Sequence, residues 1–302
     1  MTIASEFAPE VGVRAPAAPR ATRPLWFSLR RELWENRSIY IAPAVVAGLV
    51  LLGFVIGLGH VPADVQVKTD NRVVFTIAPY GLAWVCITGA GLIVAAFYCL
   101  GALHNERRDR SILFWKSMPV SDLATVATKA AVPLAVMPAV VFVLVLAAQL
   151  VIWLIAIAIH AANGNAVAAL WAQWPMGRMS LMMAWGLFTM SLWYAPVWGW
   201  LLMVSAWARR APFLWAVLPP LGVCVVEGVA FSSGQFAHLL GRRLTGAVDV
   251  AFADMPRGEV MPDVSQIDPV RFFTSPETWL GLAFAAAFLA VAVWLRRRKD
   301  PT

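Results

Sequence analysis

The residues best placed to do chemistry lie at 104–122, HNERRDRSILFWKSMPVSD, which we call the docking segment. In it, charged side chains are followed directly by large apolar ones. This order suits noncovalent docking, because arginines pair with carboxylates and aromatic side chains gain free energy when a partner buries them. The candidate contacts are Glu106, Arg107, Arg108, Asp109, Arg110, Ser111, Ile112, Leu113, Phe114, Trp115, Lys116 and Pro119. The alternative is an ordinary loop whose charges only set the orientation of the chain.

A second set of candidates lies inside apolar stretches of the chain. Glu227 is the one acidic residue there, and a carboxylate in hydrocarbon costs at least ~2.5 kcal/mol. It either contacts a substrate or ion on a translocation path, or lies close to the outer interface at the end of a short span. The other candidates are three tryptophans at seven-residue spacing, which places them on one expected helical face: Trp193, Trp200 and Trp207. They either line a path or pack against neighbouring helices and lipid.

Other kinds of site are poorly supported by the sequence. The four histidines are far apart, and the three cysteines, all in apolar stretches, form no Cys-x-x-Cys pair. No Ser/His/Asp set and no Gly-x-x-x-x-Gly-Lys-Ser/Thr phosphate loop is present. We therefore expect no catalysis, no metal and no cofactor bound by this chain.

The elements that must position these residues are membrane helices. Of 302 residues, 60% are hydrophobic and 14% are charged, and the mean hydropathy is +0.71. Soluble domains average about 45–50% apolar and 25% charged residues, so a soluble or disordered protein is excluded. The net charge of +7 then indicates the cytoplasmic ends of membrane helices, and we expect no nucleic-acid partner.

Six apolar stretches reach the roughly 20 residues that a membrane span needs. They are 39–59, 73–103, 130–160, 179–208, 212–232 and 278–295. The short break at 209–211 predicts a tight antiparallel hairpin. The expected fold is an all-α polytopic membrane protein with six transmembrane helices over 38–302.

The distribution of Lys and Arg sets the expected orientation. Seventeen of the 24 basic residues lie on the side that holds both termini and the loop 104–129, and seven lie on the other side. The richer side is cytoplasmic by the positive-inside rule. The outer segment 233–277 is long, and long segments cross with little regard to their charge.

The N-terminal region divides into two parts. Residues 1–23 are rich in Ala, Pro and Arg, which predicts a disordered cytoplasmic tail. Residues 24–37 predict an amphipathic helix in the cytoplasmic interface, the alternative being a cytosolic extension of the first span. One expected face holds Leu25, Trp26, Leu29, Leu33 and Trp34, and the other holds Arg30, Arg31, Glu32 and Glu35.

The docking segment resembles the coupling region of the permease subunits of type-2 ABC exporters, the ABC-2 family. The matching positions are Glu106, Arg107, Arg108, Ser111, Ile112, Leu113, Pro119, Val120 and Ser121. Six spans, an amphipathic entry helix and a long outer segment also match. The resemblance implies a cytoplasmic coupling helix that contacts a separate ABC ATPase carrying ATP and Mg²⁺. It further implies a second permease copy, identical or similar, in the inner membrane of a bacterium.

Two other functions are compatible with the sequence. A membrane anchor or regulatory subunit would dock a cytosolic partner through the same segment. A secondary transporter driven by an ion gradient would carry several charged groups near the midplane and inverted repeats. We find one acidic residue and no obvious repeat. The substrate, whether peptide, drug, lipid or ion, is not specified by any of these features.

Overall fold

The computed structural model describes residues 22–58, 71–109, 121–162, 176–252 and 264–298. Within these ranges the chain consists of helices joined by short turns, with one isolated bridge between Phe252 and Ile267. Five helices are long and apolar enough to cross a membrane, and one bent pair supplies a sixth candidate. The predicted all-α membrane fold is therefore confirmed, with five or six helices that could span a membrane where the sequence predicts six.

The described helices follow the predicted spans closely. In chain order they are α1 (Thr22–Glu35), α2 (Ser38–Leu58), α3 (Asn71–Ala102), α4 (His104–Arg108), α6 (Asp122–Ala131), the π-helix η1 (Val132–Val136), α7 (Met137–Ala162), α9 (Met176–Trp193), α10 (Ala195–Trp207), α11 (Pro212–Phe231), α12 (Gln235–Thr245), α13 (Ala247–Ala251), the 3₁₀ turn η2 (Val264–Gln266), α14 (Pro269–Thr274) and α15 (Pro276–Arg298).

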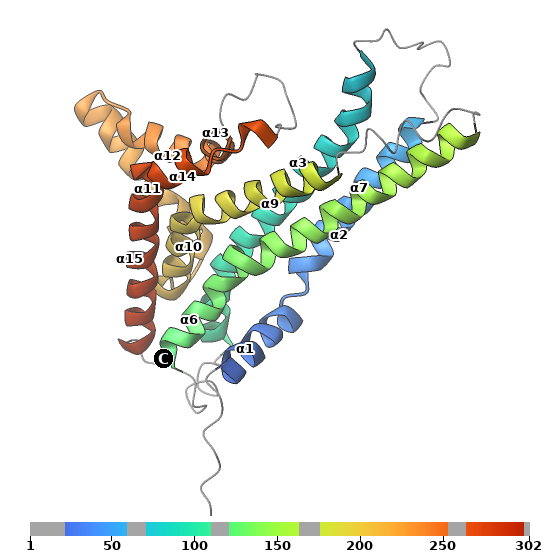
Figure 1. Ribbon diagram of the computed structural model, residues 1–302. Coiled ribbons are helices and arrows are strands. Elements are labelled where there is room, and N and C mark those ends of the chain that lie inside the picture. Colours follow the sequence, from blue (N-terminus) through green and yellow to red (C-terminus); the bar gives the residue numbers. More distant parts are fainter. Residues whose placement is uncertain (1–21, 59–70, 110–120, 163–175, 253–263, 299–302) are drawn as a thin grey trace, which may run out of the picture.

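The long helices form a bundle in which α2, α3 and α7 run side by side and α10 packs along α15 (Figure 1). Close approach of the second pair depends on Gly199, because a Cβ there would lie 3.1 Å from the carbonyl oxygen of Ala285. Helix α3 also contacts α10, so it joins the two groups.

The predicted fourth span is not one straight helix. Helix α9 ends at Trp193 and α10 begins at Ala195, with a bend of 46° between them. Pro196 lies in the first turn of α10, where its missing N–H removes a helical hydrogen bond. The expected face through Trp193, Trp200 and Trp207 therefore crosses the bend, with Trp193 on α9 and the other two residues on α10.

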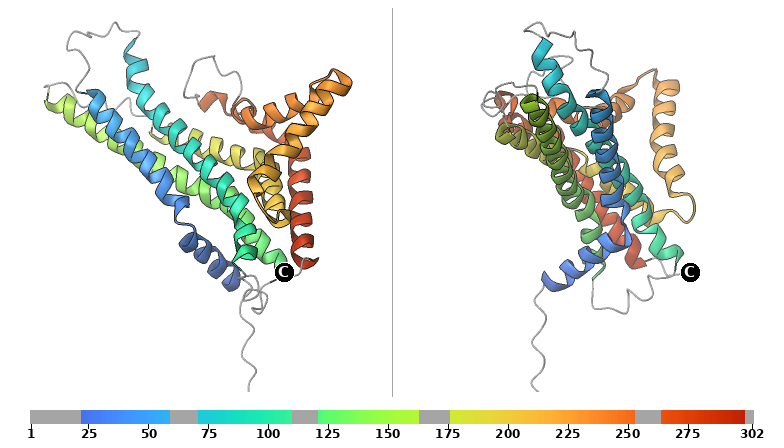
Figure 2. Two further views of the ribbon diagram at one scale, coloured as in Figure 1. Left: turned by 180° about the vertical axis from the view of Figure 1, so that it is seen from behind. Right: turned by 90° about the vertical axis from the view of Figure 1, so that its right-hand side faces the viewer.

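The two ends of the bundle carry different short helices. At one end lie α1, α4, α6 and the last turn of α15, close to the C-terminus (Figure 1). At the other end lie α12, α13 and α14, which come from the predicted outer segment (Figure 2). The predicted disordered tail at 1–23 lies outside the described residues, except that Thr22 and Arg23 are the first residues of α1.

The outer surfaces of the bundle are apolar. Side chains such as Leu49 on α2 and Val229 on α11 are 61% and 82% exposed within the single chain. Helix α11 packs mainly on α10 and α12 and leaves most of its large side chains uncovered. Surfaces of this kind suit contact with lipid or with another membrane helix.

Candidate functional site

A buried network of ion pairs lies at the end of the bundle that carries both flanks of the docking segment. We call it the ion network. It consists of Glu32, Tyr98, Glu106, Asp122, Lys129 and Arg296. These residues come from α1, α3, α4, α6 and α15, so a single set of contacts connects five helices.

Arg296 joins the two flanks of the docking segment. Its Nη1 donates a 2.6 Å hydrogen bond to Oε2 of Glu106, and its Nε donates a 2.9 Å bond to Oδ1 of Asp122. Glu106 precedes the central part of the segment, and Asp122 follows it. One guanidinium from the last helix therefore holds both ends of the segment in charge-assisted bonds.

Lys129 joins the other half of the ion network. Its Nζ lies 3.0 Å from Oε1 of Glu106 and 2.7 Å from Oε1 of Glu32, while the hydroxyl of Tyr98 donates a 2.9 Å bond to Oε2 of Glu32. Only 3% of the Lys129 side chain is exposed. Since a buried lysine side chain is costly without partners, the two carboxylates explain why Lys129 is tolerated at this buried position.

A second set of hydrogen bonds fastens α4 to α10. The Oγ of Ser205 accepts from the backbone N–H groups of Leu103 and His104, at 3.0 and 2.9 Å. The guanidinium of Arg107 donates to the carbonyl oxygens of Ser205 and Ala208, at 2.5 and 2.9 Å. These carbonyls lie in the last turn of α10 and just beyond it, where helical partners are missing. The start of the docking segment is thus held by α10 and α15 together.

The faces of α1 differ from the sequence prediction. The sequence predicts Glu32 on the polar face, but in the structure Glu32 is buried in the ion network. It shares this buried face with Leu29 and Leu33, which pack against the core. Trp26 and Trp34 were expected beside these leucines, but they project away from the bundle and are 65% and 64% exposed. The reason is that Glu32 has Lys129 and Tyr98 as partners, so this carboxylate is stable on the buried face.

The structure places the predicted docking residues in three groups. Glu106 is buried and Arg107 is half-buried, and both are engaged inside the chain, whereas Arg108 and Asp109 are exposed. The remaining candidates lie outside the described residues: Arg110, Ser111, Ile112, Leu113, Phe114, Trp115, Lys116 and Pro119. The expected start of the next helix is confirmed, because Oγ of Ser121 accepts from the N–H of Ala124 at 3.1 Å.

At the opposite end of the bundle, Arg243 of α12 lies over the ring of Trp193, with Cζ 4.3 Å from the ring centroid. The indole N–H of Trp193 donates to the carbonyl oxygen of Arg243 at 2.9 Å, and Nη1 of Arg243 donates to that of Glu277 at 3.3 Å. Burial lowers the pKa of the Arg243 guanidinium, and the nearby Glu277 carboxylate opposes that change. This contact joins α12 to the bend after α9 and to the start of α15.

The other residues of the predicted path also make contacts within the chain. Glu227 lies one turn before the end of α11 and accepts from the backbone N–H groups of Gln235 and Phe236, both at 2.8 Å, and from Ser233 at 2.9 Å. Its carboxylate thus lies at the N-terminus of α12, a position that favours negative charge. The indole of Trp200 donates to the carbonyl oxygen of Ala216 at 3.0 Å, which joins α10 to α11 in the expected hairpin.

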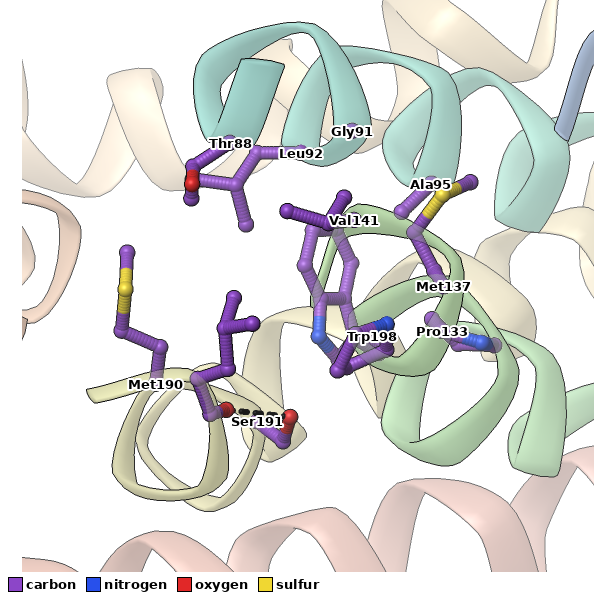
Figure 3. Close-up of a pocket in the computed structure, with 12 residues that line it drawn as sticks. Thr88, Gly91, Leu92, Ala95, Pro133, Met137, Val141, Met190, Ser191 and Trp198 are labelled. Atoms are coloured by element: carbon purple, nitrogen blue, oxygen red, sulfur yellow. Dashed lines mark hydrogen bonds between the residues drawn. The ribbon is translucent and has the colours of Figure 1, made fainter. Parts of the chain in front are cut away.

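A small apolar cavity of about 30 Å³ lies where α3, the π-helix, α7, α9 and α10 meet (Figure 3). Thr88, Met137, Met190 and Trp198 are among its lining residues. Among the described residues, Oγ1 of Thr88 has no hydrogen-bond partner, although it is buried. The volume suits a single water molecule rather than a substrate.

The described residues contain no group of three or more His, Cys, Asp or Glu that could hold a metal ion. Sequence reasoning missed Glu32, Lys129 and Arg296 as site residues. Each is a charged residue within or next to an apolar helix face, and that is the signal that could have identified them. No known protein family, curated protein or solved structure showed significant similarity to the chain.

Proposed function

We propose that this chain is the transmembrane permease subunit of an ATP-driven exporter of the ABC-2 type. A separate ATPase subunit docks on the cytoplasmic docking segment, and ATP binding there drives alternating access between two permease copies. The substrate is unspecified. The proposal rests on the motif at 104–122, the succession of apolar helices and the ion network.

The observation that carries the proposal is that Arg296 bonds both Glu106 and Asp122. A segment that only sets topology needs no fixed geometry at its two ends. Here both ends are bonded to the last helix, and Lys129 extends the connection to α1. A displacement of the docking segment would therefore be passed directly to α1, α10 and α15.

Phe114 and Trp115 are the proposed ATPase anchors, with the arginines around them at the rim. Glu106 and Arg107 are then positioning residues, because their side chains are bonded to other helices of the chain. Arg108 and Asp109 are exposed, so they can still contact the ATPase directly.

The proposal is tested by purifying the full-length tagged chain from its native membrane in nanodiscs. We expect an ABC ATPase subunit to copurify and to hydrolyse ATP. An environment-sensitive label at Leu239→Cys on α12, where the native side chain is 63% exposed, should then respond to ATP with vanadate.

Each rival function gives a different result. A membrane anchor or regulatory subunit would retain the ATPase, but the label on α12 would not respond to nucleotide. A secondary transporter would copurify with no ATPase, and after reconstitution into sealed liposomes the label would respond to an ion gradient instead. Either outcome would overturn the proposal.

A further inference from the structure

Helix α1 presents a row of aromatic and basic side chains on the side turned away from the bundle, which we call the outward stripe. Trp26, Phe27 and Trp34 are 65%, 66% and 64% exposed, and Arg30 and Arg37 are exposed as well. The residues of α1 in this stripe recur three and four positions apart, so they share one helical face. Cζ of Arg30 lies 5.9 Å from the ring centroid of Trp34.

The stripe has a net positive charge. Arg31 and Glu35, which flank it, form an exposed ion pair with each other. Glu32 is directed into the ion network and does not neutralise the stripe. Arg30 and Arg37 therefore present positive charge beside three large aromatic rings.

The position of α1 places this stripe at the boundary of the membrane. Helix α2 is a candidate span that begins at Ser38, and only two residues separate it from Glu35, the last residue of α1. The two helices differ in direction, and α1 projects sideways from the end of the bundle (Figure 2). Tryptophan rings favour the depth of the lipid headgroups, and arginine side chains bind headgroup phosphates.

We propose that the outward stripe binds the headgroups of anionic phospholipids in the cytoplasmic leaflet. An acidic protein surface would satisfy the arginines equally well. Such a protein, however, would have to reach side chains that lie next to the first residue of a membrane span. It would also not explain why three aromatic rings, which favour the lipid interface, lie beside the arginines. A lipid surface fits the charge, the aromatic rings and the depth together.

The proposal has a consequence for the ion network. The stripe and Glu32 lie on opposite faces of the same 14-residue helix. Lipid that holds the stripe thus holds Glu32 against Lys129 and Tyr98 on the other face. This inference does not depend on the transport function, because it concerns only the membrane contact of α1.

The test uses the full chain in nanodiscs of phosphatidylcholine with a minor fraction of spin-labelled phosphatidylglycerol, or of spin-labelled phosphatidylcholine. The wild type should immobilise the anionic label in preference to the zwitterionic one. In Arg30→Gln with Arg37→Gln, the preference should fall about fivefold for each arginine removed. Replacement of the same two residues by Lys should retain most of it.

The matched control is Arg209→Gln with Arg210→Gln. It removes two exposed arginines from the turn between α10 and α11, and so changes the net charge by the same amount. This variant should keep the preference of the wild type. Equal loss in the two Gln variants would mean general charge attraction and would overturn the proposal. Full preference in the α1 variant would also overturn it, and would leave an acidic protein as the partner of the stripe.

Discussion

Oε2 of Glu106 accepts a 2.6 Å hydrogen bond from Nη1 of Arg296, a residue 190 positions later in the chain. The bond joins the short helix after the second span to the last helix. The other oxygen of the same carboxylate lies 3.0 Å from Nζ of Lys129. Glu106 therefore shares its charge between two cations, and it links the half of the ion network around Arg296 to the half around Lys129.

Lys129→Met should be strongly destabilising. It removes the cation between Glu32 and Glu106 and leaves two buried carboxylates facing each other, which costs about 3–5 kcal/mol. Thermal unfolding of the full chain in nanodiscs measures the effect. Arg242→Met is the control, because its pair with Glu277 is exposed and contributes at most about 1 kcal/mol. Equal shifts in the two variants would contradict the burial of Lys129.

The two carboxylates that bind Arg296, those of Glu106 and Asp122, should contribute unequally to the free energy of unfolding. Glu106→Gln removes charge from a site with two buried cations, and we expect a loss of about 2 kcal/mol. Asp122→Asn should cost less than about 1 kcal/mol, because 25% of the Asp122 side chain is exposed to solvent. The same unfolding measurement gives both values, and the reverse order would show that Asp122, not Glu106, is the principal partner of Arg296.

Much of the fold was accessible from local sequence. The apolar runs predicted the spans within a few residues, since hydrophobic length is a property of each segment by itself. Ser121 predicted the start of α6, because an N-cap needs only the next three residues. The bend after Trp193 could have been inferred from Pro196, which lies inside the apolar run 179–208. Its missing N–H interrupts the helical hydrogen bonds there.

The ion network could not be read in the same way. Its pairs join residues 97 and 190 positions apart, and sequence periodicity carries no information on such distances. Glu32 was assigned to the polar face of its helix because an isolated carboxylate favours water. Tertiary contact with Lys129 and Tyr98 reverses that preference. The same argument applies to Glu106, which composition alone places at the surface.

The contact between Arg243 and Gly281 should behave as a coupled pair. A Cβ at residue 281 would overlap the Arg243 guanidinium, so Gly281→Ala should displace it from the Trp193 ring and cost about 1–2 kcal/mol. The double variant with Arg243→Ala should be no less stable than Arg243→Ala alone. A double-mutant cycle of unfolding free energies checks this, and additive effects would show that the two residues act independently.

The orientation of the chain can be tested with single cysteines in a background that lacks Cys86, Cys99 and Cys224. Trp115→Cys and Met255→Cys are expected on opposite sides, because 17 of 24 basic residues lie on the side of the docking segment. An impermeant thiol reagent added outside should label position 255 only. Labelling of position 255 only from inside would reverse the orientation.

The most direct test of the central claim measures how much ATPase subunit the chain retains when Phe114→Ala and Trp115→Ala are combined. Aromatic anchors at an interface commonly contribute at least 2 kcal/mol, so we expect affinity to fall about 30-fold while the spans stay folded and inserted. Phe97→Ala with Phe213→Ala is the control, since both side chains are exposed on the outside of membrane helices. Loss of the ATPase in the first variant and retention in the control is the predicted result. Retention at the wild-type level in both variants would contradict the account, and the docking segment would then be only a signal of topology.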